Sequence, residues 1–501
     1  MLEFIDCLLC RDYETDNEIL RAGSWKKFKK NWKNYQIYLF GTGMACTTFI
    51  KKYENKIKIE GVFDNSPVKW GTKFSGYEVN NPSEIKGKDN ILVIITTTSY
   101  MDDIASQLDD MGFHNYYGLA VMESKKLILK MFVAVLNFIL WYMLPVKKNR
   151  ILISNGFRKY GDSPKAIVDE LLKENVDCEV LWMNPDPNCQ YPKEIKLVSG
   201  KVLPKIIAHA TSKVWIDTFK KELWIRKKKS QRYINTWHGS VPIKKLDFDD
   251  SSCSARHLKR TEYDSNLIDL RISNSRMCTD IYRNAMKYKG EVLECGTPRL
   301  DKLFAEEKSA KVRERLRIPQ GSSIILYAPT YRQATKSGFQ GKNNIDLDFE
   351  RLRQTLKELY KREVYILIKL HPAAKRVEIE QSEYIKDVTD WDDVYELLKD
   401  SDALISDYSS LVFEMGFILK PVYLYVNDYE QYKQERGVYF ELDDLPFPNA
   451  YDQNELECKF AEFNYDEYIK KVSRFNEKRL AVNERGDATV QVVSRIKQYL
   501  H

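Results

Sequence analysis

The sequence predicts an α/β protein in which two parallel-sheet domains are joined by a hinge and are preceded by a smaller unit of the same kind. Three observations predict this fold class. Short apolar runs alternate with helical patterns from about residue 150 onward, which is typical of parallel sheets. The run Gly296-Thr-Pro298 interrupts the alternation, and we expect the hinge there. A chain of 501 residues is also too long for one core, so two or three domains are expected.

The amino-acid composition narrows the classes of function that the chain could have. Hydrophobic residues make up 43% of the chain and charged residues 30%, which is typical of a globular protein. The formal net charge of +7 fits a phosphate-rich substrate or an anionic membrane surface without requiring either. No dense basic tract with interleaved aromatic residues is present, which argues against nucleic-acid binding. Nine scattered cysteines indicate a reducing cytosol, and the start of the chain, which has an early acid, shows no secretory signal.

Residues 1–122 are expected to form the smaller, Rossmann-like unit. A strand at Gln36–Phe40 precedes a tight turn at Gly41 and Gly43, and a second strand ends at Asp64. In a dinucleotide-binding half the two glycines would make the turn, and an acid about 20 residues on would meet a ribose. The third glycine of that fingerprint is absent. Nucleotide binding, a vestigial role and partner binding therefore all stay open for this unit.

Residues 123–149 are predicted to be an amphipathic linker helix that lies in a membrane interface. Lysine pairs bracket an apolar run whose stretch from Met131 to Pro145 is shorter than the ~20 residues that span a bilayer. Trp141 and Tyr142 would lie at headgroup depth while the lysines meet anionic lipid. A buried interdomain helix is the alternative. Trp224, among basic residues farther on, predicts either a second membrane-surface element or a plain basic loop.

The first large domain is expected to cover residues 150–297. Its predicted strands are Arg150–Ser154, Cys178–Trp182, Lys213–Asp217, Tyr233–Trp237, Arg271–Asn274 and Val292–Glu294. His238 and Gly239 directly follow the fourth of these strands. Because glycine lets the chain turn, the imidazole is expected to stay at the carboxyl end of that strand, where open α/β sheets bind ligands.

The second large domain is expected to cover residues 298–501. Its predicted strands are Ile324–Tyr327, Val364–Leu370, Ala403–Ser406 and Val422–Tyr425. After the third strand comes a polar turn and a helix that begins near Leu411, with Ser409 or Ser410 as its N-cap. The hydroxyls, free N–H groups and helix dipole would suit a phosphate, although an ordinary capped helix is the alternative. The helical C-terminal stretch is expected to cross back to the preceding domain. Two such domains with a hinge describe the GT-B architecture.

Two of the six histidines, His238 and His371, follow a strand and precede a helix-breaking residue. An unperturbed imidazole titrates near pH ~6.5, which suits general base work. The two lie in different predicted domains, so a cleft between the domains would bring them together. Structural histidines are the alternative for such a pair.

Five motifs in order resemble those of the CDP-glycerol glycerophosphotransferase family, the teichoic-acid primases and polymerases. They are Asn235-Thr-Trp237-His238-Gly239, Gly296-Thr-Pro298-Arg299-Leu-Asp301, Tyr327-Ala-Pro329-Thr330-Tyr331-Arg332, Lys369-Leu-His371-Pro372 and Ser401–Gly416. The similarity covers about two-thirds of the chain, from Arg150 to the C-terminus. It implies a GT-B fold and an attack of a polyol hydroxyl on the β-phosphorus of CDP-glycerol, with release of CMP. The acceptor would be lipid-linked, in teichoic-acid or capsule assembly.

The resemblance implies roles for individual residues. His238 would be the base, and His371 would contact the pyrophosphate or assist the leaving group. The implied donor-binding residues are Gly239, Thr330, Arg332, Lys369, Asp407, Ser409, Ser410 and Glu414, the last through a ribose hydroxyl. Arg299 and Asp301 would either pair with each other at the hinge or meet a ligand. The acidic run Asp247-Phe-Asp249-Asp250 is interpreted as acid–base pairing on the surface, so we expect no obligatory metal or other cofactor.

Rival functions stay open. A related transferase could use CDP-ribitol or a nucleotide sugar, and a protein of the same fold could have become an inactive scaffold. The expected partners are a CDP-activated polyol, a lipid-linked acceptor and an anionic membrane surface. We expect a peripheral protein at the cytoplasmic face of the cell membrane. Whether the chain forms a homo-oligomer, and whether it adds one unit or many, cannot be predicted from the sequence.

Overall fold

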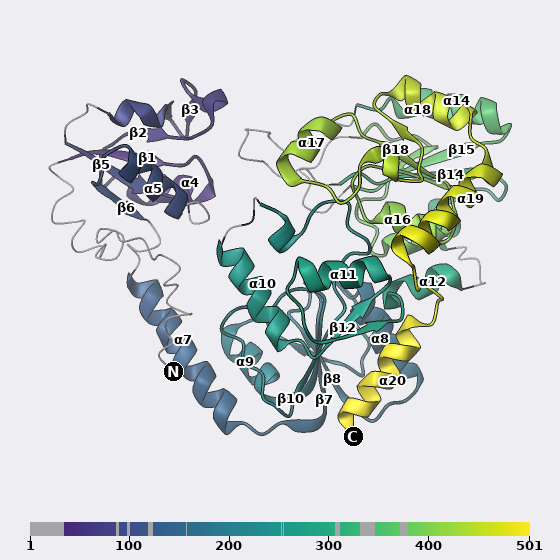
Figure 1. Cartoon of the computed structure of the whole chain (residues 1–501), viewed down its shortest axis with the longest axis horizontal. Coiled ribbons are helices and arrows are strands. Elements are labelled where there is room, and N and C mark those ends of the chain that lie inside the picture. The colour runs from purple at the N-terminus through teal and green to yellow at the C-terminus, as the bar shows by residue number, and fades with distance from the viewer. Residues whose placement is uncertain are drawn as a thin grey trace. The chain divides into compact units, whose positions relative to one another are not determined.

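The computed structural model describes residues 35–86, 90–97, 101–118, 124–156, 158–251, 253, 255–305, 311–330, 346–370 and 379–501. The chain forms two compact units. One holds a small N-terminal sheet, and the other, which begins at Ile139, holds two larger sheets (Figure 1).

The N-terminal unit is a six-stranded sheet in the order β3-β4-β2-β1-β5-β6. All neighbours are parallel except β3 and β4. The strands are β1 (Gln36–Phe40), β2 (Ile59–Phe63), β3 (Lys73–Phe74), β4 (Tyr77–Asn80), β5 (Ile91–Ile95) and β6 (Tyr116–Gly118). The helices are α4 (Met44–Tyr53) and α5 (Met101–Asp110). Parallel order with crossover helices is a Rossmann-like arrangement.

The helix α7 (Ser124–Met143) leads into the first large sheet, which has seven parallel strands in the order β13-β12-β11-β10-β7-β8-β9. The strands are β7 (Lys147–Ser154), β8 (Glu179–Met183), β9 (Lys196–Val198), β10 (Ser212–Asp217), β11 (Arg232–Asn235), β12 (Leu270–Ser273) and β13 (Glu291–Glu294). The helices are α8 (Asp162–Lys173), α9 (Val202–Thr211), α10 (Ala255–Leu267) and α11 (Arg276–Asn284). Leu152 packs into one buried cluster and its neighbours Ile151 and Ile153 into another, so both faces are covered, as in α/β proteins.

The second large sheet has six parallel strands in the order β16-β15-β14-β17-β18-β19. They are β14 (Ser323–Tyr327), β15 (Val364–Ile368), β16 (Ile385–Asp387), β17 (Ala403–Ser406), β18 (Val422–Tyr425) and β19 (Asn449–Ala450). The elements around them are η5 (Pro298–Leu300), α12 (Asp301–Phe304), α13 (Lys311–Leu316), α14 (Phe349–Tyr360), α15 (Val394–Asp400), α16 (Leu411–Phe417), α17 (Tyr429–Arg436), α18 (Gln453–Ala461) and α19 (Tyr465–Arg474).

The last helix, α20 (Ala488–Leu500), leaves the second sheet and packs on α8 beside the first (Figure 1). Its buried residues Val492, Val493 and Ile496 join the core of the first sheet. Asp301 accepts hydrogen bonds from the N–H groups of Ala488 (3.1 Å) and Thr489 (2.7 Å) and so satisfies the free donors at the start of α20. The crossover therefore connects the end of the chain to the segment where the hinge was predicted.

The carboxyl edges of the two large sheets contact each other through their loops. Lys159, which follows β7, pairs with Asp392, which follows β16, at 2.9 Å. A second contact joins the segment after β11 to the segment after α17: the N–H of Tyr439 donates to the carbonyl of Ile243 at 2.7 Å. Ligands of parallel sheets bind at the carboxyl ends of the strands. Because these ends of the two large sheets contact each other, we treat them as parts of one candidate site.

Candidate active site

Strand β11 delivers His238 to the carboxyl edge of the first large sheet. Past the end of the strand, the N–H of Thr236 still donates to the carbonyl of Asp217 on β10 at 3.0 Å. Trp237 then adopts a left-handed φ of +56°, which is uncommon outside glycine. Its buried side chain and the hydrogen bond from its N–H to Asn235 Oδ1 (3.1 Å) hold this conformation. His238 therefore leaves the sheet in a fixed direction.

The imidazole of His238 lies flat on the ring of Phe219, with centroids 4.2 Å apart and planes 4° apart. Its Nδ1 lies 3.2 Å from the carbonyl oxygen of Thr218. Because a carbonyl only accepts, Nδ1 carries the proton of the neutral ring and Nε2 carries the lone pair. The ring is thus held in the tautomer that can accept a proton at Nε2.

Gly156 makes this stack possible. A Cβ at position 156 would lie 2.1 Å from Cδ2 of Phe219, which is far inside van der Waals contact. The N–H of Gly156 also donates to Thr218 Oγ1 at 3.3 Å. The loop after β7 therefore supports the loop after β10, which in turn supports His238. The sequence alone does not indicate a role for Gly156 and Phe219 at this site, because no local pattern connects residues so far apart in the chain.

Burial lowers the pKa of His238 to about 4. The Thr218 carbonyl and the Asp162 carboxylate act against this shift, while Arg299 and Lys244 add to it. The imidazole is consequently neutral at pH 7, which is the form that a general base needs. The negative charge of a bound diphosphate would raise this pKa toward neutrality.

On the second sheet, Asp407 organises the turn after β17. Its Oδ1 accepts hydrogen bonds from the N–H and the hydroxyl of Thr330, both at 2.8 Å, and from the N–H of Tyr408 at 2.7 Å. Asp407 is buried, so its carboxylate stabilises the turn from the interior of the domain. Thr330 follows β14, which pairs with β17 in the sheet. Two residues that the sequence predicted at the donor site are thus joined directly.

The serine pair lies where the helix begins. Helix α16 starts at Leu411, as predicted, and Ser410 occupies its N-cap position without a capping hydrogen bond from its side chain. Instead, Ser409 Oγ accepts from the N–H of Leu411 at 3.3 Å. Both side chains are partly exposed at the carboxyl edge of β17. Their phosphate-binding role stays a prediction.

Three other predicted donor-site residues differ in what the structure describes. Lys369 Nζ donates to the carbonyls of Thr389 (2.6 Å) and Trp391 (2.7 Å), and burial lowers its pKa to about 8. Arg332 and His371 lie outside the described residues. The predicted facing of the two histidines across a cleft therefore stays a prediction.

Of the two alternatives for Arg299 and Asp301, their pairing with each other is wrong, and a ligand role stays a prediction. The guanidinium of Arg299 instead pairs with Asp162 and Glu414, each at 2.9 Å, whereas Asp301 caps α20. Glu414 is 1% exposed, so its carboxylate is directed to Arg299 in the interior. The ribose contact predicted for Glu414 stays a prediction that this geometry does not support.

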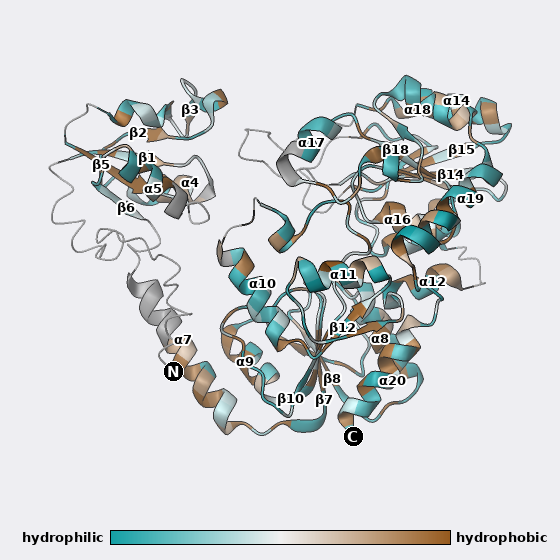
Figure 2. Ribbon diagram, viewed as in Figure 1, coloured by the Kyte–Doolittle hydropathy of each residue, from teal (hydrophilic) through white to brown (hydrophobic). Residues whose placement is uncertain are grey.

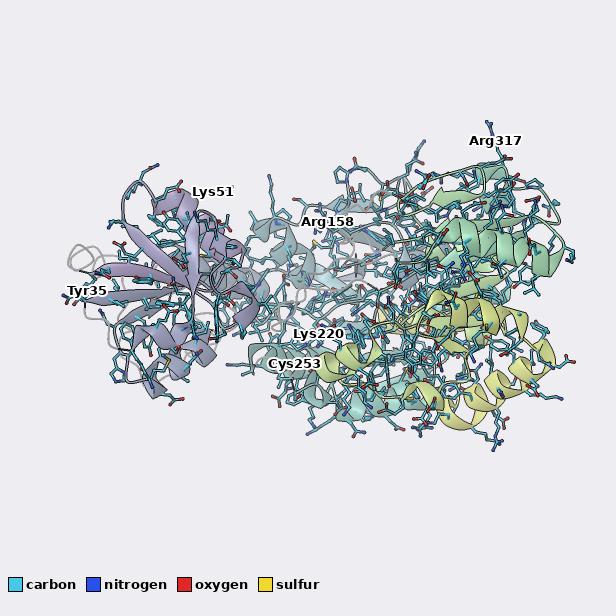
Figure 3. All side chains as sticks on the ribbon, turned by 90° about the horizontal axis from the view of Figure 1, so that it is seen from above. Tyr35, Lys51, Arg158, Lys220, Cys253 and Arg317 are labelled. Atoms are coloured by element: carbon cyan, nitrogen blue, oxygen red, sulfur yellow. The ribbon has the colours of Figure 1, made fainter. Side chains whose placement is uncertain are left out.

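Asp247 pairs with a base, as predicted, but its predicted position on the surface is wrong. Asp247 is buried and accepts hydrogen bonds from Lys220, from Thr261 (2.8 Å) and from His257 (2.6 Å). Burial opposes its ionisation, but these donors lower its pKa to about 2. Figure 3 labels Lys220, whose Nζ lies 5.9 Å from the centroid of the Trp237 ring. Within the described residues, no group of His, Cys, Asp and Glu could hold a metal ion. The absence of an obligatory metal stays a prediction.

In the N-terminal unit, the carboxylate that was predicted to meet a ribose is already bonded to residues of the unit itself. Gly41 has a left-handed φ of +98°, and Gly43 is the extended N-cap of α4. Asp64 accepts hydrogen bonds from the N–H (3.0 Å) and hydroxyl (2.6 Å) of Thr42, and Lys69 pairs with it at 3.2 Å. A ribose would have to compete with these partners. Nucleotide binding by Gly41, Gly43 and Asp64 stays a prediction.

The residues predicted to meet a membrane differ in exposure. Tyr142, near the end of α7, is 78% exposed, whereas Trp141 is partly buried under Arg226, 5.7 Å from its ring. Trp224 packs against the core, with Lys205 Nζ 5.3 Å from its ring. Figure 2 shows that the C-terminal half of α7 is mostly hydrophobic. None of the described helices has the length and apolar character needed to cross a bilayer.

Two parallel-sheet domains that meet at their carboxyl edges, with a terminal helix crossing between them, define a GT-B transferase fold. Solved structures confirm this class. A variant of the wall teichoic acid polymerase TagF, soaked with CDPG, matches with a TM-score of 0.65 and 25% identity, covering 74% of this chain and 93% of that one.

The family follows from the sequence match. The model of CDP-glycerol:poly(glycerophosphate) glycerophosphotransferases matches residues 136–498, and the chain belongs to this family. A model described as C2185-like, N-terminal, matches residues 33–117. The chain is 29% identical over 379 residues to the teichoic acid glycerol-phosphate transferase of Staphylococcus aureus (strain NCTC 8325 / PS 47), covering 72% of this chain and 95% of that one. It is 31% identical over 260 residues to the teichoic acid glycerol-phosphate primase of Bacillus subtilis (strain 168), covering 50% and 65%.

Proposed function

We propose that this chain transfers glycerol phosphate from CDP-glycerol to a hydroxyl group of a lipid-linked acceptor and releases CMP, in the assembly of teichoic acid or a related capsule polymer. The observation that carries the proposal is His238, a neutral imidazole with its lone pair on Nε2 at the carboxyl edge of a parallel sheet. Family membership and the named relatives support the same donor and the same transferred group.

In the proposed reaction, Nε2 of His238 takes the proton of the acceptor hydroxyl as its oxygen attacks the β-phosphorus of the donor. A new P–O bond forms to the acceptor, and the bond from the β-phosphorus to the bridging oxygen breaks. CMP leaves with that oxygen and its negative charge. Catalysis of phosphoryl transfer depends mainly on positioning and on neutralising such charge.

The donor would bind at the carboxyl edge of the second sheet. Thr330, Ser409 and Ser410 are proposed to hydrogen-bond phosphate oxygens, with Asp407 holding the turn in shape. Gly239, beside His238, would let the donor approach the backbone. Arg332, Lys369 and His371 are proposed to meet the charge of the leaving CMP. The exposure of the two serines at this edge supports the proposal.

A donor panel tests the function. The full-length protein is incubated with CDP-glycerol, CDP-ribitol or a UDP-sugar, together with a lipid-linked acceptor, and release of CMP or UMP is measured. The proposal expects CMP from CDP-glycerol, and mass spectrometry should show an acceptor heavier by glycerol phosphate. Faster release from CDP-ribitol or the UDP-sugar would overturn the donor assignment. No release from any donor would favour the inactive scaffold.

We also propose that the chain works as a peripheral protein at the cytoplasmic face of the membrane. The end of α7 supports this, because Ile139, Tyr142 and Met143 are 44%, 78% and 70% exposed. A hollow of ≈ 540 Å³ lies beside them. It is lined by Trp141, Tyr142, Met143, Leu144, Pro145, Val146, Lys148, Lys213, Lys228 and Ser230. Exposed apolar groups beside lysines suit an anionic bilayer.

Flotation with vesicles tests membrane binding. Tyr142→Asp and Trp141→Asp are expected to weaken binding to phosphatidylglycerol vesicles while turnover on a soluble acceptor analogue stays normal. Tyr451→Asp is the matched control, because Tyr451 is 48% exposed in the second large domain. Equal binding by all variants would contradict the proposal for α7. If the wild-type protein bound neutral phosphatidylcholine vesicles as well as phosphatidylglycerol vesicles, the lysines would have no part in the proposed membrane binding.

A further inference from the structure

Arg299 connects the two large domains through two ionic contacts, one to the buried Glu414 and one to Asp162, whose side chain is 11% exposed. It lies in η5, at the hinge, and its side chain is 2% exposed. Nη1 donates to Asp162 Oδ1 and Nη2 to Glu414 Oε1, each at 2.9 Å. The guanidinium also lies 5.7 Å from the centroid of the Tyr395 ring. One side chain thus contacts three segments that are distant in sequence.

Each carboxylate belongs to one half of the site. Asp162 is the first residue of α8 beside the first sheet, and it adopts a left-handed φ of +61°. Glu414 lies one turn into α16, directly after the turn that carries Ser409 and Ser410. Burying these charges costs desolvation energy that ionic pairing often fails to recover. The ionic bridge is therefore better explained by a need to fix the relative positions of α8 and α16 than by a gain in the free energy of unfolding.

The bridge is linked to the base in two ways: its charges act electrostatically on the imidazole of His238, and Asn155, the residue before Gly156, donates to the carbonyl of Gly161 at 3.0 Å, one residue before Asp162. Three charged groups of the described residues act on His238: Asp162 from the start of α8, Arg299 from η5 and Lys244 from the segment after β11. Among the described groups that lie against the ring, the Thr218 carbonyl, the Phe219 ring and the Trp237 ring carry no charge. Two of these three charged groups, Asp162 and Arg299, therefore belong to the ionic bridge.

We propose that Arg299 is a positioning residue for His238, which holds Asp162 and Glu414 together and so fixes the helix after the donor turn against the domain that carries the base. This inference rests on the proposed function for its effect on turnover, but its structural part does not. A lysine should not replace Arg299, because its single ammonium nitrogen lacks the rigid fork in which Nη1 reaches Asp162 and Nη2 reaches Glu414.

Turnover and the pKa of His238 test this inference together. The variants are Arg299→Lys, Arg299→Met, Asp162→Asn and Glu414→Gln, and CMP release is measured for each. We expect at least a 10-fold loss of kcat/KM in both Arg299 variants. The ring pKa, followed by NMR of histidine-labelled protein, should rise in Arg299→Met, because a cation is lost, and fall in Asp162→Asn, because an anion is lost.

Arg353→Met is the matched control. Arg353 is also buried and paired with a carboxylate, Glu350, but both lie on α14 of one domain. Its loss should leave kcat/KM and the pKa of His238 unchanged. If Arg299→Met does not fold, Asp162→Asn and Glu414→Gln carry the test, because both keep the guanidinium. Each should lower kcat/KM, and normal kcat/KM in both would overturn the inference.

Two results separate this inference from the proposed function. Absence of CMP release by the wild-type protein would remove the proposed function, and the NMR titration would still judge the inference. Normal release by Arg299→Lys and Arg299→Met, with an unshifted His238 pKa, would overturn the inference while the proposed function stands.

Discussion

The ring of His238 rests on the ring of Phe219 at a centroid distance of 4.2 Å, and Phe219 rests on the backbone of Gly156. The three residues come from loops after three strands, β11, β10 and β7, which lie side by side in the sheet order β11-β10-β7. The position of Nε2 is therefore set by a layered contact across the carboxyl edge of the sheet. A change in the lowest layer should move the imidazole without touching it.

Gly156→Ala should lower turnover by about 10-fold or more, because the methyl group would displace Phe219 and the imidazole above it, and misplacements of ~1 Å can cost ~10²-fold. The overpacking should also cost about 1–3 kcal/mol of unfolding free energy. Gly161→Ala is the control, since a Cβ at Gly161 meets no atom within 4 Å. Steady-state CMP release and urea unfolding measure the two effects. Equal turnover in both variants would show that the stack does not position the base.

His238→Ala and His371→Ala should each lower kcat by at least ~10²-fold, which is the usual loss with a general acid or base. The exposed His114 of the N-terminal unit, which pairs with Asp109 at 2.8 Å, provides the control. His114→Ala should release CMP at the wild-type rate. Near-normal release by His238→Ala or by His371→Ala would remove that histidine from the mechanism.

Stability should depend on pH through His238. Its pKa is about 4 when folded and about 6.5 when unfolded, so the unfolded chain binds the proton first as the pH falls. The contribution of this residue is constant above pH 6.5 and declines between pH 6.5 and 4, by roughly 3 kcal/mol in all. Urea unfolding of wild type and His238→Asn at pH 7, 5 and 4 measures this. A constant difference between the two proteins across that range would contradict the lowered pKa.

The sequence predicted the central strands of the two large sheets because buried strands leave local patterns, but it did not predict the short edge strands β9, β16 and β19. The predicted strands Ala403–Ser406 and Val422–Tyr425 match β17 and β18. Strand β7 begins at Lys147, three residues before the predicted Arg150, because Lys147 pairs with Ser212 on β10. The placement of His238 also followed from local information, since a strand that ends before His-Gly presents the histidine at its carboxyl edge.

The contacts around the site could not be predicted in the same way. The partners of Arg299 lie 137 and 115 residues away along the chain, and no spacing rule links them. Asp247 lies next to two other acids in sequence, which suggested a surface, yet the fold buries it against Lys220 and His257. The tertiary structure determines which buried ionic side chains pair with each other, and a single sequence does not show that structure.

Asp407→Asn should raise the KM for CDP-glycerol, because the carboxylate oxygen that accepts from both the N–H and the hydroxyl of Thr330 would become part of a neutral amide. Hydrogen bonds to a charged group contribute about 1.5–3 kcal/mol, and their weakening should loosen the turn at the donor edge. Asp402, at the other end of β17, accepts from the N–H of Ile324 at 2.8 Å and provides the matched control. Asp402→Asn should lose about 1 kcal/mol of stability with the KM for CDP-glycerol unchanged. If both variants shift KM equally, the effect belongs to the sheet as a whole, and Asp407 has no particular part in donor binding.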